Sequence, residues 1–357
     1  MSICVSKFAH LQSIAKRWGK RLKAGALDEK KRTRGASSAF SAIVKKELAD
    51  YLTSWRMIIL IALILLTCFG SLYTAMTTIR DALDSSEEAK EIAKGAYLFL
   101  KLFTVSDGTL PSFVTFVGFL GALLGIALGF DAINSERNRG TLSRLMAQPI
   151  PRDYVINGKF VAALLLNAVL FLSLGLLVTA LGILVLGIPP TFEEFARMVC
   201  FLLLCLVYIA FWLNVGILFS VVFRQAATSA LSALAVWLFF NLFYAMIVEV
   251  VAKSFLQSDA ITSVEQAVGR QELVLGLMRL SPSYLFNEST TALLSLDVRT
   301  LGIVTVEQTA GAVAAPLPFS QSVLLIWPQA TALIAAALVC FAIAYWLFMR
   351  QEIRASG

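Results

Sequence analysis

The stretch FDAINSERNRGTLSRLMAQPIPRDYVINGKF, residues 130–160, is the most polar part of an apolar neighbourhood, and hydrophobic runs flank it on both sides. Across all 357 residues, 58% are apolar and 15% are charged, and the mean hydropathy is +0.79. Soluble domains are typically about 45–50% apolar and about 25% charged. The composition therefore predicts a membrane protein, in which the quoted stretch is a loop between two membrane spans.

Six runs of the sequence are long enough to cross the hydrocarbon core of a bilayer, which takes about 20 predominantly apolar residues. The segments expected to face outward between them show no strand-like alternation of apolar and polar residues. The predicted fold class is therefore an all-α polytopic membrane protein. Its predicted spans are residues 57–77, 112–130, 160–187, 195–223, 226–251 and 323–349.

The distribution of charge predicts the orientation of these spans. If the N-terminus is cytoplasmic, the inside segments are the tail up to Arg56, the loop 131–159, Arg224 and the tail 350–357. They carry 21 of the 30 Lys and Arg residues but only 8 of the 23 Asp and Glu residues. Lys and Arg concentrate on the cytoplasmic side of membrane proteins. Both termini are therefore expected to be cytoplasmic, which agrees with an even number of spans.

The residues before the first span divide into two segments. Residues 1–38 form a basic tail without the apolar core of a signal peptide, and we expect this tail to attract anionic lipid. A faint likeness to an organellar transit peptide is the alternative. Residues 39–56 place their apolar side chains along one helical stripe, with Lys45 and Lys46 facing the other way. This pattern predicts an amphipathic helix in the membrane interface, or else a plain extension of the first span.

Two longer segments are expected to lie outside the cell. Residues 78–111 contain a charged helical run at 84–94. Residues 252–322 form the extracytoplasmic segment before the sixth span, and we expect helices within 260–280 and over 282–296.

The first half of the polar loop has the residues that end one helix and begin another. Residues 131–144 are predicted to continue the second span into the cytoplasm, and Gly140 is predicted to break or bend that helix. Thr141 is well placed to cap a short second helix over residues 142–147.

The second half of the loop ends that short helix sharply. Pro149 and Pro151 stop it, because a residue that precedes proline is pushed toward extended geometry. The chain restarts as a helix near Asp153, whose carboxylate suits a helix N-terminus. We call residues 131–152 the elbow. Its predicted form is a compact, rigid, charged structure on which a partner protein could push.

The sequence lacks the motifs of an enzyme. A P-loop requires GxxxxGK[ST], but Gly158-Lys159 is followed by Phe160 and no glycine stands at the required offset. With His10 as the single histidine, a Ser-His-Asp triad is excluded, and the five cysteines show no metal-binding spacing. The chain is therefore predicted to have no catalytic residue, no bound cofactor and no metal site.

Some small and polar residues within the spans could mark an interface or a substrate path. Asn214 and Asn241 could bond a neighbouring helix or line such a path. Glycines recur on one face of the second span and permit close helix packing, within the chain or with a second copy. These glycines are Gly118, Gly121, Gly125 and Gly129.

The loop also resembles the ABC-2 type transporter permeases, most closely the group with the nitrous-oxide-reductase maturation and gliding-motility permeases. The shared pattern is D-x4-E-x3-G-T-L-x2-L-x3-P-I-x-R-x5-G-K. Its positions here are Asp131, Glu136, Gly140, Thr141, Leu142, Leu145, Pro149, Ile150, Arg152, Gly158 and Lys159. The run Lys45-Lys46-Glu47-Leu48 resembles the amphipathic helix with which members of that family begin, and Ser281-Pro282-Ser283-Tyr284 is similar to a further family element.

This resemblance implies a permease subunit of an ATP-binding cassette transporter in a bacterial or archaeal cytoplasmic membrane, with export as the family direction. Two copies, as a homodimer or a heterodimer, would each dock on a separate ABC ATPase subunit that binds ATP and Mg. Membrane lipids would surround the spans, and no nucleic acid partner is implied. The helix containing Lys45, Lys46, Glu47 and Leu48 would touch the same ATPase.

The resemblance also implies which residues couple the permease to its ATPase. The implied coupling residues are Glu136, Arg137, Arg139, Gly140, Thr141, Leu142, Arg144, Leu145, Pro149, Arg152 and Arg224. Two other functions stay open. One is an ATPase-coupled scaffold or mechanotransmitting subunit with no cargo of its own. The other is a membrane enzyme that acts alone, for which the sequence offers no motif.

Overall fold

The computed structural model is helical wherever it has regular structure among the residues it describes. The described residues are 39–84, 97–106, 108, 110–142, 147, 151–186, 189–256, 264–295 and 317–351. Six helical segments are long and apolar enough to cross a membrane. This confirms the predicted fold class and the predicted number of spans.

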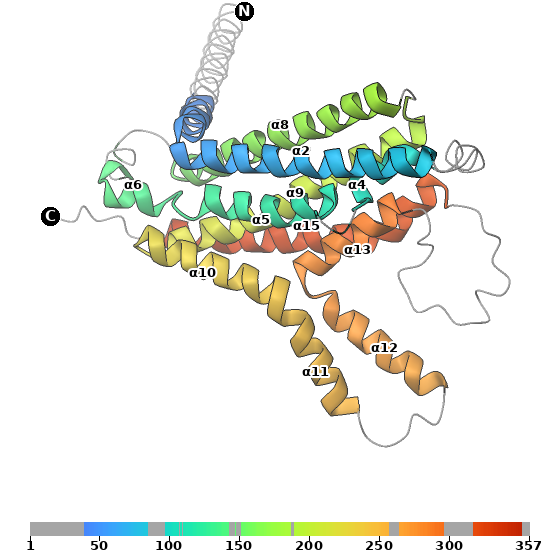
Figure 1. Cartoon of the computed structure of the whole chain (residues 1–357). Coiled ribbons are helices and arrows are strands. Elements are labelled where there is room, and N and C mark those ends of the chain that lie inside the picture. Colours follow the sequence, from blue (N-terminus) through green and yellow to red (C-terminus); the bar gives the residue numbers. More distant parts are fainter. Residues whose placement is uncertain are drawn as a thin grey trace, which may run out of the picture.

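The six spans lie side by side in a bundle (Figure 1). They are α2 (Trp55–Asp84), α5 (Phe113–Gly129), α8 (Asp153–Leu186), α9 (Phe192–Val222), the fifth span made of α10 (Ala226–Leu238), η1 (Phe239–Phe243) and α11 (Tyr244–Leu256), and α15 (Phe319–Arg350). We call the end that carries the elbow the elbow end, and the opposite end the far end. Both ends of the described chain lie at the elbow end (Figure 1).

Helix α9 is the centre of the bundle, and it packs most extensively against α5 and α15. Three glycines of the α5 stripe, Gly121, Gly125 and Gly129, face α9, and Gly118 faces Phe286 of the helix Pro282–Leu294. A Cβ atom added at Gly125 would lie 2.7 Å from the carbonyl oxygen of Ile209, and one at Gly129 would lie 2.5 Å from that of Leu213. The two backbones are therefore in contact. Of the two alternatives for this stripe, the structure uses it for packing within the chain.

The fifth span differs from the single uninterrupted helix predicted over residues 226–251. A π-helical turn, η1, interrupts it, and α11 beyond this turn leans away from the bundle to pair with α12 (Val264–Met278) (Figure 1). Only 11% of the most apolar stretch of this span is buried, against 72% of the corresponding stretch of α9. The fifth span therefore presents most of its surface outside the monomer.

The segment before the sixth span contains the two expected helices, α12 and α13 (Pro282–Leu294). Ser281 caps α13, since its hydroxyl accepts a hydrogen bond from the amide of Tyr284. Helix α13 packs between α9 and α15, and Phe286 stacks on Tyr208 with ring centroids 4.4 Å apart. That the whole segment 252–322 faces outward stays a prediction, and its residues 257–263 and 296–316 lie outside the described part.

At the far end, two side chains near the start of α9 hydrogen-bond the neighbouring helices. The carboxylate of Glu194 completes a capping box with Thr191 and accepts a hydrogen bond at 3.1 Å from the amide of Phe99, in the short helix α4 (Leu98–Thr104). One turn later, Arg197 is fully buried and donates to groups on α13 and at the start of α15. Of the charged run predicted at 84–94, residues 85–94 lie outside the described part of the chain.

Candidate functional site

The elbow begins where α5 ends. Helix α5 stops at Gly129, a turn follows, and α6 (Asn134–Asn138) carries the chain to Gly140, whose φ of 68° is left-handed. Glycine adopts this conformation without the steric cost that a side chain brings. Gly140 therefore breaks the helix as predicted, and α8 starts at Asp153, also as predicted. Residues 143–146 and 148–150 lie outside the described part.

The structure adds two details to the predicted elbow. The second span bends after Gly129 before α6 continues it, and at this bend the hydroxyl of Ser220 on α9 accepts hydrogen bonds from the amides of Ile133 and Asn134, at 2.9 and 3.2 Å. These bonds give the amides a partner outside the helix at the point where it turns. Thr141 stays a predicted cap, because the amides that its hydroxyl would accept from, those of residues 143 and 144, lie outside the described part. Its hydroxyl donates to the backbone carbonyl of Glu136 at 3.2 Å and holds the chain back against α6.

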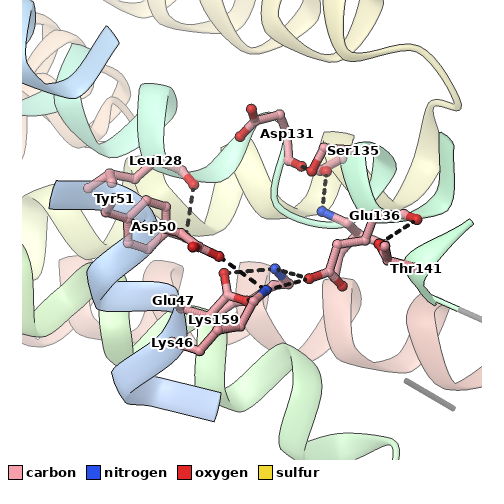
Figure 2. A network of polar contacts seen from close by, with 12 residues as sticks. Lys46, Glu47, Asp50, Tyr51, Leu128, Asp131, Ser135, Glu136, Thr141 and Lys159 are labelled. Carbon is pink, nitrogen blue, oxygen red and sulfur yellow. Dashed lines mark hydrogen bonds and ion pairs between the residues drawn. The ribbon is translucent and has the colours of Figure 1, made fainter. Parts of the chain in front are cut away.

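Behind the elbow, four side chains form a compact ion cluster (Figure 2). The buried ammonium of Lys159 on α8 lies 2.9 Å from Glu47 Oε2 and 3.0 Å from Glu136 Oε1. The ammonium of Lys46 lies 2.8 Å from Glu47 Oε1 and 3.3 Å from the same Glu136 oxygen. We call these four residues the ion cluster. It joins three segments that are far apart in sequence: the helix of residues 39–53, α6 and α8.

Two ammonium groups keep Glu47 ionised despite its burial. Burial alone would raise the pKa of Glu47, but the charges and hydrogen bonds of Lys159 and Lys46 outweigh it, so the pKa lies below its usual 4.5. For Lys46, burial disfavours the charged form, while contacts with Glu47, Glu136 and Asp50 favour it more strongly and raise the pKa. Glu47 and Lys46 therefore carry full charges at neutral pH.

The helix of residues 39–53 packs onto the start of α8. Phe40 meets the ring of Tyr154 edge-on with centroids 5.5 Å apart, and Ile43 covers Gly158 so closely that a Cβ there would lie 2.7 Å from it. The predicted apolar stripe of this helix omitted Glu47, which the structure buries on the same side as Ile43. Its partner Lys159 lies over a hundred residues away in sequence, so no local pattern reveals the pair. That this helix lies in the membrane interface stays a prediction.

The implied coupling residues separate into an outer and an inner set. The exposed residues are Arg139, Gly140, Thr141, Arg152 and Arg224. In the helix of residues 39–53, Lys45 is also exposed, while Leu48 is half-buried, as is Arg137 of α6. The turn that carries Arg224 lies against α6, because the side chain of Asn138 donates to the carbonyl of Arg224 at 3.1 Å. The inner set consists of Glu136 and Leu142.

Glu136 and Leu142 face the inside of the elbow rather than a partner. The side chain of Glu136 is only 13% exposed, and Leu142 is buried. The reason is tertiary: Lys159 offers Glu136 a buried counter-charge, and apolar neighbours cover Leu142. Arg144, Leu145 and Pro149 lie outside the described residues.

The two asparagines proposed for a path have different surroundings. Asn214 is buried in α9, and its amide donates to the carbonyl of Ala337 on α15 at 2.9 Å, so it bonds two spans together. Asn241 lies in η1, is exposed, and donates to the carbonyl of Trp237 in its own span. Asn214 thus serves packing within the chain, while Asn241 presents an amide to the surroundings of the fifth span.

Sequence reasoning missed three residues that organise the structure. Lys159 is a motif position to which the sequence assigns no partner, and the roles of Ser220 and Arg197 were not predicted. A basic residue one turn inside an apolar span is itself a signal, because such a residue is costly in a membrane unless it is paired. The partners of Arg197, however, come from α13 and α15, which no local pattern places beside α9.

Six apolar helices and a polar elbow braced by buried charges define a multi-pass membrane protein. Residues 41–353 match the family model described as ABC-2 family transporter protein, so the chain belongs to this family. Over 149 residues it is 31% identical to a protein named probable ABC transporter permease protein NosY, from Stutzerimonas stutzeri. That match covers 41% of this chain and 52% of the relative, so the chain spans about half the length of this curated relative.

Acidification is expected to loosen the helix of residues 39–53. Because the pKa of Glu47 is lower in the folded protein than its usual 4.5, its ion pairs stabilise the fold fully above pH 4.5. This contribution is lost as the pH falls through the lower folded-state pKa. A fluorophore attached at the exposed Ala49 should become more accessible to a soluble quencher below pH 4.5, and the change should be smaller in a Glu47→Gln variant. The same pH profile in both proteins would contradict this role of Glu47.

Proposed function

We propose that this chain is the membrane-spanning permease subunit of an ABC transporter, noncatalytic in itself, and that a separate ATPase subunit binding ATP and Mg²⁺ docks on its elbow. Membership of the ABC-2 family supports this proposal, and so does the similarity to a protein named as a probable ABC transporter permease. In this proposal the elbow end is cytoplasmic, as the positive charge of its segments favours.

The observation that carries the proposal is an exposed basic surface on a firmly held support. Arg139 of the elbow and Arg224 of the following turn are exposed near one another, because Asn138 ties their two segments together. Ser220 fastens the start of α6 to the end of α9. We call Arg139 and Arg224 the basic face. A partner with a complementary acidic surface would bind here, and electrostatic complementarity would direct the encounter.

Force applied to the basic face would reach the centre of the bundle. Helix α6 is hydrogen-bonded to α9, which packs along most of its length against α5 and α15. Packed helices move as rigid bodies with discrete arrangements rather than by continuous bending. Closure of the ATPase subunits would therefore shift α9 together with its neighbours.

A second copy of the chain, or a related permease, is proposed to lie against the fifth span. Most of that span is unburied in the monomer, and Asn241 presents an amide near its middle. Its nitrogen donates to the carbonyl of Trp237 in the same span, but an exposed amide remains costly to place against hydrocarbon, so a protein neighbour or a hydrated path is favoured there. Export as the direction of transport rests on the family resemblance.

The alternative is a subunit that transmits ATPase motion without carrying cargo. The paired helices α11 and α12, which lean away from the bundle, favour it, because a projecting pair of helices could move a partner outside the membrane (Figure 1). Nucleotide-driven movement of α12 in vesicles that accumulate or release no solute would support this alternative. Nucleotide-dependent flux would support transport.

Charge reversal of the basic face tests the docking proposal. The double variant Arg139→Glu with Arg224→Glu is expected to weaken co-purification of the P-loop ATPase at least about tenfold, because like charges would then face one another. The exposed Lys253 on α11 provides the control, and a Lys253→Glu variant should retain the ATPase. Undiminished binding by the double variant would place the docking surface elsewhere, and a wild-type chain that retains no ATPase would overturn the proposed function.

A further inference from the structure

We propose that Lys159 is a positioning residue that closes a seam between two parts of the elbow end, and that this seam opens on its Glu136 side when the ATPase acts. The proposal rests on the proposed coupling function, and it assigns the direction in which the elbow moves. The seam is the boundary between the helix of residues 39–53 with the start of α8 on one side, and α6 with the end of α9 on the other.

The first part is held together by packing as well as by charge. Phe40 contacts Tyr154, Ile43 covers Gly158, and the buried Glu47 pairs with Lys159 at 2.9 Å. All three contacts join the helix of residues 39–53 to the first two turns of α8. This part is therefore expected to move as one body.

The second part is held by hydrogen bonds to the central helix. Ser220 accepts from the amides of Ile133 and Asn134, and Asn138 donates to the carbonyl of Arg224. The side chain of Gln351, just after α15, donates to the carbonyl of Val221 at 2.7 Å. The elbow helix α6 is thus tied to α9 and to the turn before α10, and Gln351 ties the end of α15 to the same α9, whereas the contact of α6 with α8 is the ion pair of Glu136 with Lys159.

The two carboxylates of the ion cluster are unequally bonded (Figure 2). Both oxygens of Glu47 have close partners, Lys46 at 2.8 Å and Lys159 at 2.9 Å. Glu136 uses only Oε1, at 3.0 and 3.3 Å, while its Oε2 is buried without a hydrogen-bond partner. A buried oxygen without a donor carries an uncompensated desolvation cost. Glu136 is therefore the side on which the ion cluster opens at least cost, and Lys159 stays with Glu47.

Polar contacts beside the seam, made by α2 and α5, are weaker barriers to opening. Arg56 pairs with Asp131 at 2.8 Å, but the side chain of Arg56 is 62% exposed, and exposed ion pairs contribute little. The hydroxyl of Tyr51 lies 3.5 Å from the carbonyl of Leu128, at the limit of a hydrogen bond. The buried ammonium of Lys159 is therefore the main polar contact that holds α6 against the first part.

The test measures distances across and within the parts. Spin labels on the exposed Ala49 and on the exposed Ala227, at the start of α10 beside the second part, lie on opposite sides of the seam. Labels on Ala49 and on the exposed Leu165, further along α8, lie on the two helices of the first part. We would reconstitute the complete complex with its ATPase, from a background with the native cysteines replaced, without nucleotide and with trapped ATP. The distance between the two labels across the seam should change by about 2 Å or more, the size of a helix shift. The distance between the two labels within the first part should stay the same.

Two variants separate positioning from folding. Lys159→Met leaves two buried carboxylates without their shared cation, so the distance across the seam should already match the ATP state before nucleotide is added, and ATPase stimulation should fall about tenfold with the ATPase still bound. Glu136→Gln keeps Lys159 paired with Glu47 and should open the seam even if Lys159→Met does not fold. Lys253→Met on α11 is the matched control and should leave the distances and stimulation unchanged.

The outcomes distinguish this inference from the proposed function. If the wild-type chain neither binds nor stimulates an ATPase, the proposed function fails. If it stimulates the ATPase while both label pairs stay constant, or change together, the seam is not the moving boundary and the inference is wrong. A wild-type distance in Glu136→Gln, with normal stimulation, would also overturn it.

Discussion

An Arg197→Met variant is expected to lose about 3–5 kcal/mol of folding free energy, the range found when one partner of a buried ion pair is removed. Arg197 is fully buried, and all of its donor groups have acceptors. It bonds Glu193 in its own helix at 2.9 Å, the carbonyl of Leu293 at 2.8 Å and the carbonyl of Leu317 at 2.6 Å. Removal of the Arg197 guanidinium would leave these acceptors in an apolar environment without a donor.

The position of these acceptors explains why one side chain has a large effect. Leu293 is at the C-terminal end of α13, where helix carbonyls lack partners within the helix, and a cation there also interacts favourably with the helix dipole. Leu317 and Ser322 belong to the start of the sixth span, and Ser322 accepts from the same guanidinium at 3.1 Å. Arg197 therefore fixes the far ends of α9, α13 and α15 relative to one another.

The effect can be measured by denaturant or thermal unfolding of the purified chain in lipid nanodiscs. An Arg197→Lys variant should recover only part of the loss, because lysine keeps the charge but not the planar fork of five donors. Arg80, which is exposed at the far end of α2, is the matched control, and Arg80→Met should unfold like the wild type. Equal stability of the Arg197→Met and Arg80→Met variants would show that the guanidinium contacts do not hold these helices.

A Gly129→Ala variant is expected to push α5 away from α9 and to destabilise the bundle by about 1–3 kcal/mol, the usual cost of overpacking a well-filled interior. The added Cβ would lie 2.5 Å from the carbonyl oxygen of Leu213 and 2.8 Å from the amide nitrogen of Ile217. Both atoms belong to the backbone of α9, so no side-chain rotation can relieve the clash. The helices must separate, which also weakens the bonds of Ser220 to the elbow.

Gly70 provides the control for this prediction, because it is also a helical glycine in a span. A Cβ there would meet only the end of the Leu110 side chain at 3.5 Å, which is ordinary contact. Gly70→Ala should therefore leave stability unchanged or raise it by up to about 1 kcal/mol, the helix-propensity difference between the two residues. A Gly129→Ala protein as stable as Gly70→Ala would mean that α5 and α9 are not in backbone contact.

The elbow shows how far local sequence signals reach. Gly140 and Asp153 were placed correctly, because a left-handed turn and a helix start depend on the residue at that position. The burial of Glu136 was not predicted, because an exposed and a buried glutamate look the same in sequence until the buried Lys159 opposite is known. The hydrogen bond from the Thr141 hydroxyl to the carbonyl of Glu136 was likewise not predicted, because it depends on the chain turning back against α6.

The sequence by itself determined the six apolar spans, the elbow between the second and third of them, and the family resemblance, because hydrophobic length and turn residues act over a few neighbouring positions. Tertiary structure alone decided that α9 is the centre, that the fifth span bends away at η1, and that Lys159 and Arg197 are buried among partners. These features depend on side chains brought together from distant segments. A charge in an apolar chain is tolerated only where such partners meet it.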